Sequence, residues 1–284
     1  MTSTAEAIDA AGEAVDRALR RSVIRVAELT TPVQSHEAAA LLRAVWHDDN
    51  YPVPANLLLT IQHAGGYLFG AYDERGELVG VSLGLLSNDG LHSHITGVVE
   101  PARRRGLGYA LKQHQRLWAL DHGITCITWT CDPLVRRNVM FNLHALGAEI
   151  VDYAVDHYGP MTDGVNHGDE SDRFIFHWQL LSDAVVRAGR ERLPFVQAAG
   201  RQPALVATER GPTPIVVAGV ARLVATPPDI ELLRASNPEE AMAWRHAMRQ
   251  AVHPALAAGG RVAGLTADGD IVVDCRRSEP SSGS

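Results

Sequence analysis

A short loop at residues 103–108 combines three arginines with two glycines in the pattern Arg-x-x-Gly-x-Gly. A β-like run, 91–99, leads into this loop, and a helical pattern leaves it at Leu107. Such a loop can direct several backbone N–H groups at one point beside a helix N-terminus, where the helix dipole favours negative charge. Glycines let the backbone approach an anion closely, and arginines add charge-assisted hydrogen bonds. These residues therefore indicate a binding site for a pyrophosphate.

The Arg-x-x-Gly-x-Gly spacing is by itself a weak signal, because so few constraints often coincide by chance. A glycine-rich turn with solvated arginines is the alternative. The pattern lacks the first glycine of a dinucleotide-binding fingerprint, and the chain contains no Gly-Lys-Ser/Thr of a P-loop. The context favours phosphate binding, since a further strand at 124–130 and a short helix beginning near Asn138 follow the loop.

Two histidines, His92 and His94, stand two apart in the run before the loop, so a strand would direct both side chains to the same face. Histidine has the unperturbed pKa that suits a general base near neutral pH. Either residue can then take a proton from a substrate amine, directly or through water. The alternative is that one or both are buried histidines that only form hydrogen bonds. Glu100 is a second candidate base, or else a surface residue beside the loop.

Two further candidates lie in and just after the strand predicted at 124–130. Asp132 can hold a substrate ammonium group or cap the turn before Pro133, and the turn is the favoured interpretation. Trp129 belongs to the apolar core of the strand or to the wall of an acceptor pocket. The acidic loop at 158–172 has no metal-ligand spacing, so we predict no metal site.

Hydrophobic periodicity predicts the elements that position these residues, with β-like and helical runs alternating along the chain. Strands are expected at 23–29, 67–72, 77–86, 91–99, 124–130, 148–155 and 173–180, and helices at 4–21, 35–46, 55–62, 107–122 and 138–146. A second αβ segment follows, with a strand at 215–226, a helix from 237 to about 258 and a hairpin around Asp268-Gly269. The predicted units are an N-terminal helical extension (1–22), a core (23–181), a linker (182–214), a C-terminal αβ segment (215–277) and a disordered tail (278–284).

Composition narrows the classes of protein that the chain can belong to. Its 284 residues carry a net charge of −7, and its basic cluster is one short loop, which argues against a nucleic-acid binder. No apolar run approaches the roughly 20 residues of a transmembrane helix, and the first residues lack the order of a signal peptide. Three cysteines without metal-ligand spacing favour a reducing compartment. We therefore expect a cytoplasmic protein with no membrane or nucleic-acid partner.

The succession of strand, Arg-x-x-Gly-x-Gly loop, helix, strand and Asn138-led helix resembles motifs A and B of the GNAT acyltransferase superfamily. The resemblance implies an α/β (α+β) GNAT fold, a mixed central sheet with splayed parallel strands at 91–99 and 124–131, plus a smaller C-terminal αβ segment. It also implies acyl-CoA as co-substrate, with its pyrophosphate on the N–H groups of 104–109 and its pantetheine arm beside β-strand backbone. The implied acyl-CoA ligands are Val98, Val99, Arg103, Arg104, Arg105, Gly106, Leu107, Gly108, Tyr109 and Asn138.

A bacterial GNAT branch of about this length resembles the chain over residues 23–275, most closely over 91–181. The resemblance rests on shared segments, which include His92-Ser93-His94, Ile127 to Leu134, Asn138 to Gly147, Tyr158-Gly159, Ser171 to Phe174 and Trp244-Arg245. Some relatives are associated with N-acylamino-acid racemase pathways, which implies an amino acid as acyl acceptor.

The resemblance implies an N-acyltransferase that moves an acetyl or short acyl group such as succinyl to the amine of a small molecule. Many GNAT enzymes place a tyrosine four residues before the glycine of motif B as the acid for the leaving thiolate; Leu143 occupies that position here. Tyr153 and Tyr158 are the remaining tyrosine candidates, and His92, His94 and Tyr158 form the catalytic prediction.

The sequence is compatible with several rival functions. The acceptor is alternatively an aminoglycoside-like amine, a peptide amine or a protein lysine. A different class altogether is a non-catalytic acyl-CoA-binding sensor or partner-binding protein. The sequence also leaves open whether residues 215–277 extend the sheet, cover the acceptor cleft or form the contact of a homodimer.

Overall fold

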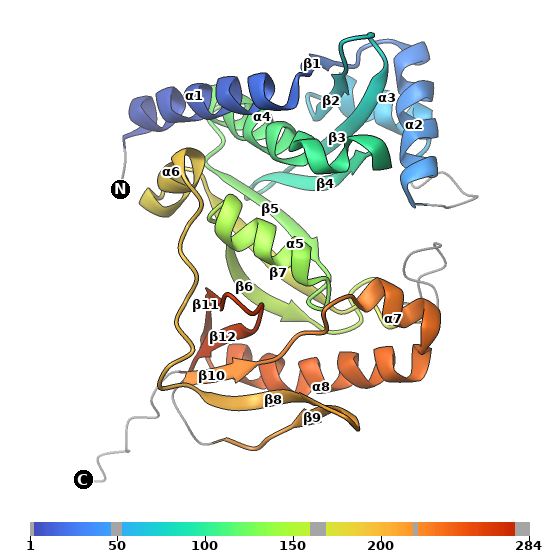
Figure 1. The fold of residues 1–284 in the computed structure, drawn as a ribbon. Helices are drawn as coiled ribbons and strands as arrows, with labels where there is room; N and C mark the ends of the chain where they lie inside the picture. Colours follow the sequence, from blue (N-terminus) through green and yellow to red (C-terminus); the bar gives the residue numbers. More distant parts are fainter. Residues whose placement is uncertain (1–2, 47–52, 160–168, 218–220, 276–284) are drawn as a thin grey trace.

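A computed structural model describes residues 3–46, 53–159, 169–217 and 221–275. Two β-sheets organise these residues. The first has the strand order β1-β2-β3-β4-β5-β7-β6, and the second the order β11-β12-β10-β8-β9. In Figure 1 the second sheet and its long helix α8 lie below the first sheet, against its β6 side.

The first sheet is mixed, because all its neighbouring strands are antiparallel except the central pair β4 and β5. This arrangement confirms the predicted mixed central sheet. Its strands are β1 (Arg25–Glu28), β2 (Tyr67–Tyr72), β3 (Leu78–Ser87), β4 (Gly90–Val98), β5 (Cys126–Cys131), β6 (Glu149–Ala154) and β7 (Arg173–Gln179).

Helices cover both faces of the β1–β4 half of the sheet. A Cβ atom built on Gly80 of β3 would lie beside Leu111 of α4, whereas one on Gly97 of β4 would lie beside Leu42 and Trp46 of α2. Helix α4 therefore packs on one face, with α1 against it, and α2 packs on the other. The helices of this unit are α1 (Thr4–Ser22), α2 (Pro32–Trp46), α3 (Ala55–His63), α4 (Leu107–Asp121), α5 (Arg136–Met140) with its π-helical continuation (Phe141–Ala145), and α6 (Asp183–Arg190).

The parallel strands β4 and β5 pair over a very short distance. Their register joins Leu91 to Ile127 and His92 to Thr128, and no further pair follows, so the strands separate toward their carboxyl ends. We call this opening the fork. Its apex lies at Ser93 and at Trp129, the first residues beyond the paired positions. The splayed parallel strands predicted from the family resemblance are thus present.

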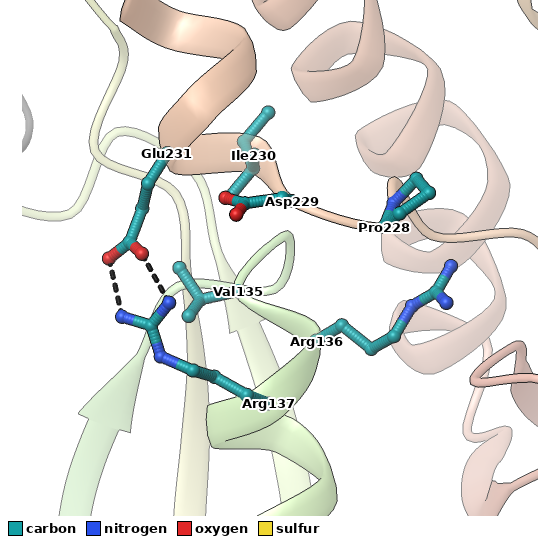
Figure 2. A pocket seen from close by; sticks show the side chains of 7 residues that line it. All are labelled: Val135, Arg136, Arg137, Pro228, Asp229, Ile230 and Glu231. Atoms are coloured by element: carbon teal, nitrogen blue, oxygen red, sulfur yellow. Dashed lines mark hydrogen bonds and ion pairs between the residues drawn. The ribbon is translucent and has the colours of Figure 1, made fainter. Parts of the chain in front are cut away.

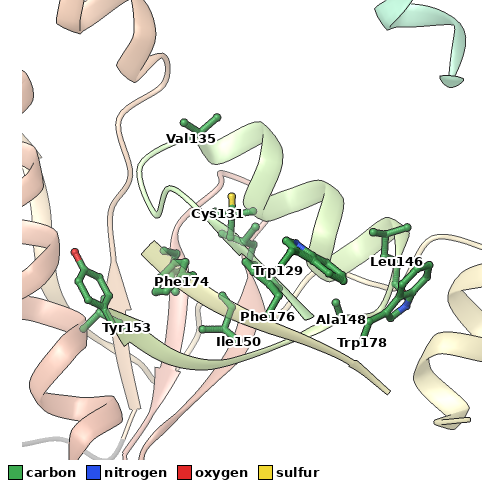
Figure 3. Close-up of a cluster of buried hydrophobic side chains, with 14 of the residues drawn as sticks. Trp129, Cys131, Val135, Leu146, Ala148, Ile150, Tyr153, Phe174, Phe176 and Trp178 are labelled. Carbon is green, nitrogen blue, oxygen red and sulfur yellow. The ribbon is translucent and has the colours of Figure 1, made fainter. Parts of the chain in front are cut away.

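Aromatic side chains fill the space between α5 and the strands β5, β7 and β6 (Figure 3). The Trp129 ring stacks on Phe176 with centroids 5.6 Å apart and meets Trp178 edge-on at 5.9 Å. The indole N–H of Trp178 donates to the carbonyl of Leu146 at 2.8 Å, so its polar atom is satisfied in the core. This packing holds β5 in place while β4 is held by the other half of the sheet.

The C-terminal unit contains the predicted helix and hairpin, but it begins earlier than expected. Residues 202–214, predicted as part of a linker, form two strands of the second sheet. The alternation of apolar and polar residues that marks a strand is interrupted here by Pro203, Pro212 and Pro214. Proline has no N–H to donate, and an edge strand such as β9 tolerates it because one of its sides pairs with no other strand. The elements are β8 (Gln202–Thr208), β9 (Gly211–Pro214), β10 (Ala221–Val224), α7 (Ile230–Ser236), α8 (Pro238–Ala257), β11 (Arg261–Leu265) and β12 (Ile271–Asp274). The predicted tail, 278–284, lies outside the described residues.

Candidate functional site

The Arg/Gly loop forms a helix N-terminus with free donors. A 3-10 turn, Glu100–Arg105, ends at Gly106, whose φ of 83° lies in the left-handed region that favours glycine. Helix α4 begins at Leu107 without a side-chain cap, and Ala110 is the first residue whose N–H bonds back, to Gly106 at 3.0 Å. The N–H groups of residues 107–109 therefore have no acceptor within the helix and can bind an anion.

Gly108 leaves open space in front of these donors. A Cβ atom built on it would meet no other atom within 4 Å, so packing within the protein does not demand a glycine here. A side chain at this position would instead occupy the space in front of the helix N-terminus. That Gly108 makes room for a bound group stays a prediction.

The side chains of this loop mainly hold it in place. The Arg103 Nε donates to the carbonyl of Val98 at 3.1 Å, and an Arg105 Nη donates to Ser22 at the end of α1 at 3.3 Å. The Tyr109 hydroxyl donates to the carbonyl of Ala188 in α6 at 3.3 Å, so Tyr109 offers the site its backbone N–H. The side chain of Arg104 lies outside the described residues.

Backbone groups of β4 face the fork at every second residue. The N–H of Val99 donates to Val79 of β3 at 3.1 Å and therefore points away from the opening. By the alternation of an antiparallel pair, the backbone groups of Val98 and Thr96 point toward β5, which has moved away at this level. Thr96 was not among the residues predicted from the sequence, because the strand register decides which residues face the fork. Asn138 is exposed in α5, the short helix that follows β5.

The three predicted catalytic residues lie on one face of β4 and β5. His94 is the unpaired residue of a β-bulge, because its neighbours Ser93 and Ile95 pair with Gly84 and Leu83. Its ring nevertheless lies near that of His92, with the two centroids 6.2 Å apart. The His92 Nδ1 is 3.3 Å from the Thr128 hydroxyl, and the Tyr158 hydroxyl is 2.8 Å from the hydroxyl of Thr130, two residues further along β5. This face, which we call the histidine face, can present a base and hydroxyl groups to one ligand.

Desolvation lowers the pKa values of both histidines below the ordinary 6.5. For His92, the charges of His94, Lys112 and His157 lower the pKa further. Both imidazoles are therefore neutral at pH 7 and able to accept a proton, which is the state that a general base requires.

Lys112, which was not among the site residues predicted from the sequence, lies on the opposite face of the fork, next to Trp129. It extends from α4 to the apex, and its Nζ donates to the Ser93 hydroxyl at 2.7 Å and to Gln115 Oε1 at 3.2 Å. The Nζ also lies 4.1 Å from the ring centroid of Trp129, a cation–π contact. Burial lowers the pKa of Lys112 from 10.5 to about 7. Trp129 is thus part of the core and supports this ammonium group.

Asp132, at the end of β5, belongs to a buried network of charges. Its carboxylate accepts two hydrogen bonds from Arg245 of α8, at 2.8 and 2.9 Å, and it also pairs with Arg234 of α7. One oxygen accepts the N–H of Leu134 at 2.9 Å, which is the turn-capping role considered from the sequence. The same two arginines pair with Asp169. Binding of a substrate ammonium by Asp132 stays a prediction, and its oxygens already have partners.

A second part of the network joins Asp172 to α8. Arg249 donates to Asp172 at 2.7 and 2.9 Å and also pairs with Glu170. The Tyr153 hydroxyl donates to Asp172 Oδ2 at 2.6 Å, an oxygen that also accepts from Arg249 Nε, and burial raises the pKa of this tyrosine well above 10. Tyr153 therefore serves the contact between the two units, which leaves Tyr158 as the tyrosine on the histidine face.

A small pocket lies between the start of α5 and α7 (Figure 2). The Arg137 guanidinium and the Glu231 carboxylate point toward each other across it and form an ion pair, with one N–O distance of 2.7 Å. The charges of these two side chains therefore compensate each other. Within the described residues no group of histidine, cysteine and acidic side chains could hold a metal ion, and none of the helices has the length and apolar character needed to cross a bilayer.

Residues 25–147 match the model of the Acetyltransferase (GNAT) family. This range covers β1 through the π-helical turn after α5, and it includes the Arg/Gly loop and both strands of the fork. The match supports an enzyme of the transferase class, an N-acyltransferase that uses acyl-CoA. No curated protein matches the chain.

Solved acetyltransferase structures are also similar to the chain. The ribosomal-protein-S18-alanine N-acetyltransferase from Escherichia coli is 15% identical, with a TM-score of 0.47 over 56% of this chain and 95% of that one. A GNAT superfamily phosphinothricin acetyltransferase from Sinorhizobium meliloti, in complex with AcCoA, is 17% identical, with a TM-score of 0.46 over 55% and 87%. The aminoglycoside 6'-N-acetyltransferase from Enterococcus faecium is 17% identical, with a TM-score of 0.43 over 56% and 98%.

Proposed function

We propose that this N-acyltransferase transfers an acetyl or short acyl group, such as succinyl, from CoA to the amine of a small molecule, with an amino acid as the preferred class of acceptor. The observation that carries the proposal is the fork itself. It opens between a helix N-terminus without a side-chain cap at one end and two histidines with lowered pKa values at the other.

The helix N-terminus and the open edge of β4 support the proposed binding of acyl-CoA. The pyrophosphate would accept hydrogen bonds from the N–H groups of residues 107–109, where Gly108 leaves space. The pantetheine amides would pair with the backbone of Val98 and Thr96, in the manner of an added strand. From Val98 back to Ser93 the strand spans roughly 17 Å at the usual rise per residue, so an extended arm reaches the apex with its thioester.

The acceptor amine would approach from the histidine face. His92 takes the proton of the ammonium group, directly or through water, and the free amine attacks the thioester carbonyl. Collapse of the tetrahedral intermediate breaks the C–S bond, the nitrogen loses its second proton to water, and CoA and an amide are released. Tyr158 and Thr130, joined by a 2.8 Å hydrogen bond, offer hydroxyl groups that orient the acceptor.

The test is the release of free CoA thiol from acetyl-CoA and succinyl-CoA in the presence of a panel of L- and D-amino acids, an aminoglycoside and a lysine peptide. We expect release that depends on one class of small amine, with the N-acylated product identified by mass spectrometry. His92→Gln should lower the rate about 100-fold while acyl-CoA still raises the melting temperature. Stabilisation by acyl-CoA without consumption of any amine would make the protein a sensor instead.

A further inference from the structure

Lys112 is the single lysine of the chain. The sequence contains 26 lysine and arginine residues together, and every other member of that set is an arginine. This one lysine is 7% exposed and lies at the apex of the fork, whereas lysines usually lie in contact with water. A buried amine is costly to keep charged, so its position calls for a reason.

The surroundings of Lys112 leave its charge uncompensated. Among the described residues no carboxylate contacts it, and its partners are the neutral groups of Ser93, Gln115 and Trp129. Arginine would stay protonated at any physiological pH, and its planar guanidinium would donate hydrogen bonds in fixed directions. A lysine in the same place can lose and regain its proton. The burial of Lys112 among neutral partners points to proton transfer.

The Ser93 hydroxyl connects Lys112 to the interior of the fork. Ser93 accepts a hydrogen bond from Lys112 Nζ at 2.7 Å, so its own O–H proton is free to be donated elsewhere. It is the first residue of β4 beyond the last pair with β5, and this is the level at which the thioester end of an extended pantetheine arm would arrive. The histidine face lies on the other side of the two strands.

We propose that Lys112 protonates the leaving CoA thiolate through the hydroxyl of Ser93. The proposal rests on the proposed function, which places the thioester in the fork. When the C–S bond of the tetrahedral intermediate breaks, the electron pair stays on sulfur, Ser93 gives its proton to the sulfur, and Lys112 gives a proton to Ser93. Lys112 becomes a neutral amine and regains a proton from solvent, which receives the proton that His92 removed from the acceptor.

The titratable groups around this relay give it a defined pH range. Among the described residues, Ser93 of β4, Gln115 of α4 and Trp129 of β5 contact Lys112, and His92 interacts with it electrostatically from across the fork. Because the acid must carry its proton, kcat should fall as the pH rises through about 7, the pKa of Lys112. Because the base must be neutral, kcat should also fall at low pH, below the lowered pKa of His92.

Kinetics of Lys112→Met, Lys112→Arg and Ser93→Ala test the relay. We expect kcat at saturating acceptor to fall about 100-fold in the methionine variant, with KM for acetyl-CoA nearly unchanged and the alkaline limb of the pH profile gone. Arginine should not restore kcat, because it keeps the charge but cannot give up the proton. Combining Ser93→Ala with Lys112→Met should add little to the single losses. Wild-type kcat and an intact alkaline limb in Lys112→Met, or full rescue by arginine, would overturn the proposal.

A binding measurement separates this inference from the proposed function. Since the chain has one lysine, protein labelled with 13Cε-lysine gives one lysine resonance, whose shift against pH reports the pKa of Lys112 directly. We expect CoA to raise this pKa, because its thiolate would stabilise the ammonium, and desulfo-CoA to leave it nearly unchanged. If both compounds bind, shown by the melting temperature, and CoA does not alter the pKa, the relay is wrong while acyl-CoA binding stands. If neither binds, the proposed function fails.

Discussion

Two buried sites of charge, the Asp/Arg network between the units and Lys112 at the apex of the fork, differ in whether an opposite charge lies beside each charged group. At the contact between the units, Asp132 and Asp169 face Arg234 and Arg245, and every one of these side chains has opposite charges around it. At the apex of the fork, Lys112 has only neutral partners in the described part of the chain.

The consequence appears in the pKa values. Burial alone would raise the pKa of Asp132, but Arg245 and Arg234 hold it well below the ordinary 3.8. Among the described residues no carboxylate contacts Lys112, and burial lowers its pKa to about 7. Paired charges thus fix geometry and keep their ionisation state at neutral pH. Unpaired charges titrate there, and this property is the one that acid–base chemistry needs.

The largest effect should come from breaking the paired cluster. Arg245→Met removes the guanidinium that bridges two buried carboxylates, both of which Arg234 also contacts. We expect a loss of about 3–5 kcal/mol in the free energy of unfolding, measured by urea denaturation. The matched control is Arg137→Met at the exposed Arg137–Glu231 pair, where the loss should stay below about 1 kcal/mol. Equal losses in the two variants would show that the buried network does not hold the units together.

The next effect separates binding from stability. Gly108→Val should weaken acetyl-CoA binding at least about tenfold, measured by calorimetry, because its side chain would fill the space in front of the α4 N-terminus. Its unfolding midpoint should not fall, since valine has a better helix propensity than glycine. Gly12→Val in α1, where a Cβ atom also meets nothing within 4 Å, is the control and should bind acetyl-CoA normally. Unchanged affinity in Gly108→Val would remove the loop from the binding site.

The two clusters should also respond to different pH ranges. The folded-state pKa of Asp132 is lowered, so its stabilisation is present above the unfolded value near 4 and is lost as the pH falls further. The folded-state pKa of Lys112 is also lowered, and for a base this means that the unfolded chain binds more protons between pH 7 and about 10. Stability relative to Lys112→Met should therefore rise by a few kcal/mol over that range. A pH-independent difference between wild type and Lys112→Met in urea unfolding would contradict the assignment.

The smallest effect concerns the histidine face. Tyr158→Phe removes one hydroxyl from an exposed hydrogen bond with Thr130. We expect KM for the acceptor amine to rise about twofold to tenfold, with binding of acetyl-CoA unchanged. A loss of kcat as large as that of Lys112→Met would instead make Tyr158 the acid for the leaving thiolate.

Local sequence patterns predicted most of the fold because the core elements are short-range features. The strand, loop and helix around residues 91–121 and the α8 helix follow from periodicity, glycines and caps. The strands β8 and β9 were hidden because prolines interrupt them and because their partners lie elsewhere in the second sheet.

The site was harder to predict because its residues, like the partners of β8 and β9, come together from distant parts of the sequence. The Asp132–Arg245 contact joins residues that are 113 positions apart in the sequence, so no local sequence pattern predicts it. Lys112 lies on a helix with several other polar residues, a pattern that predicts a helix exposed to solvent. In the structure these residues are buried, and α1 packs against the helix. One signal was present in the sequence, namely a single lysine among 26 basic residues. The role of Thr96 needed the strand register.

The proposed proton transfer from Lys112 through Ser93 to the CoA sulfur is tested most directly by a structure of the protein with bound acetyl-CoA. The decisive measurement is the distance from the thioester sulfur to Ser93 Oγ. We predict that the pyrophosphate lies against residues 107–109, that the sulfur lies within hydrogen-bond distance of the Ser93 hydroxyl, and that the acetyl carbonyl is open to the histidine face. A sulfur atom away from the apex, or a pyrophosphate bound away from the loop, would contradict the account.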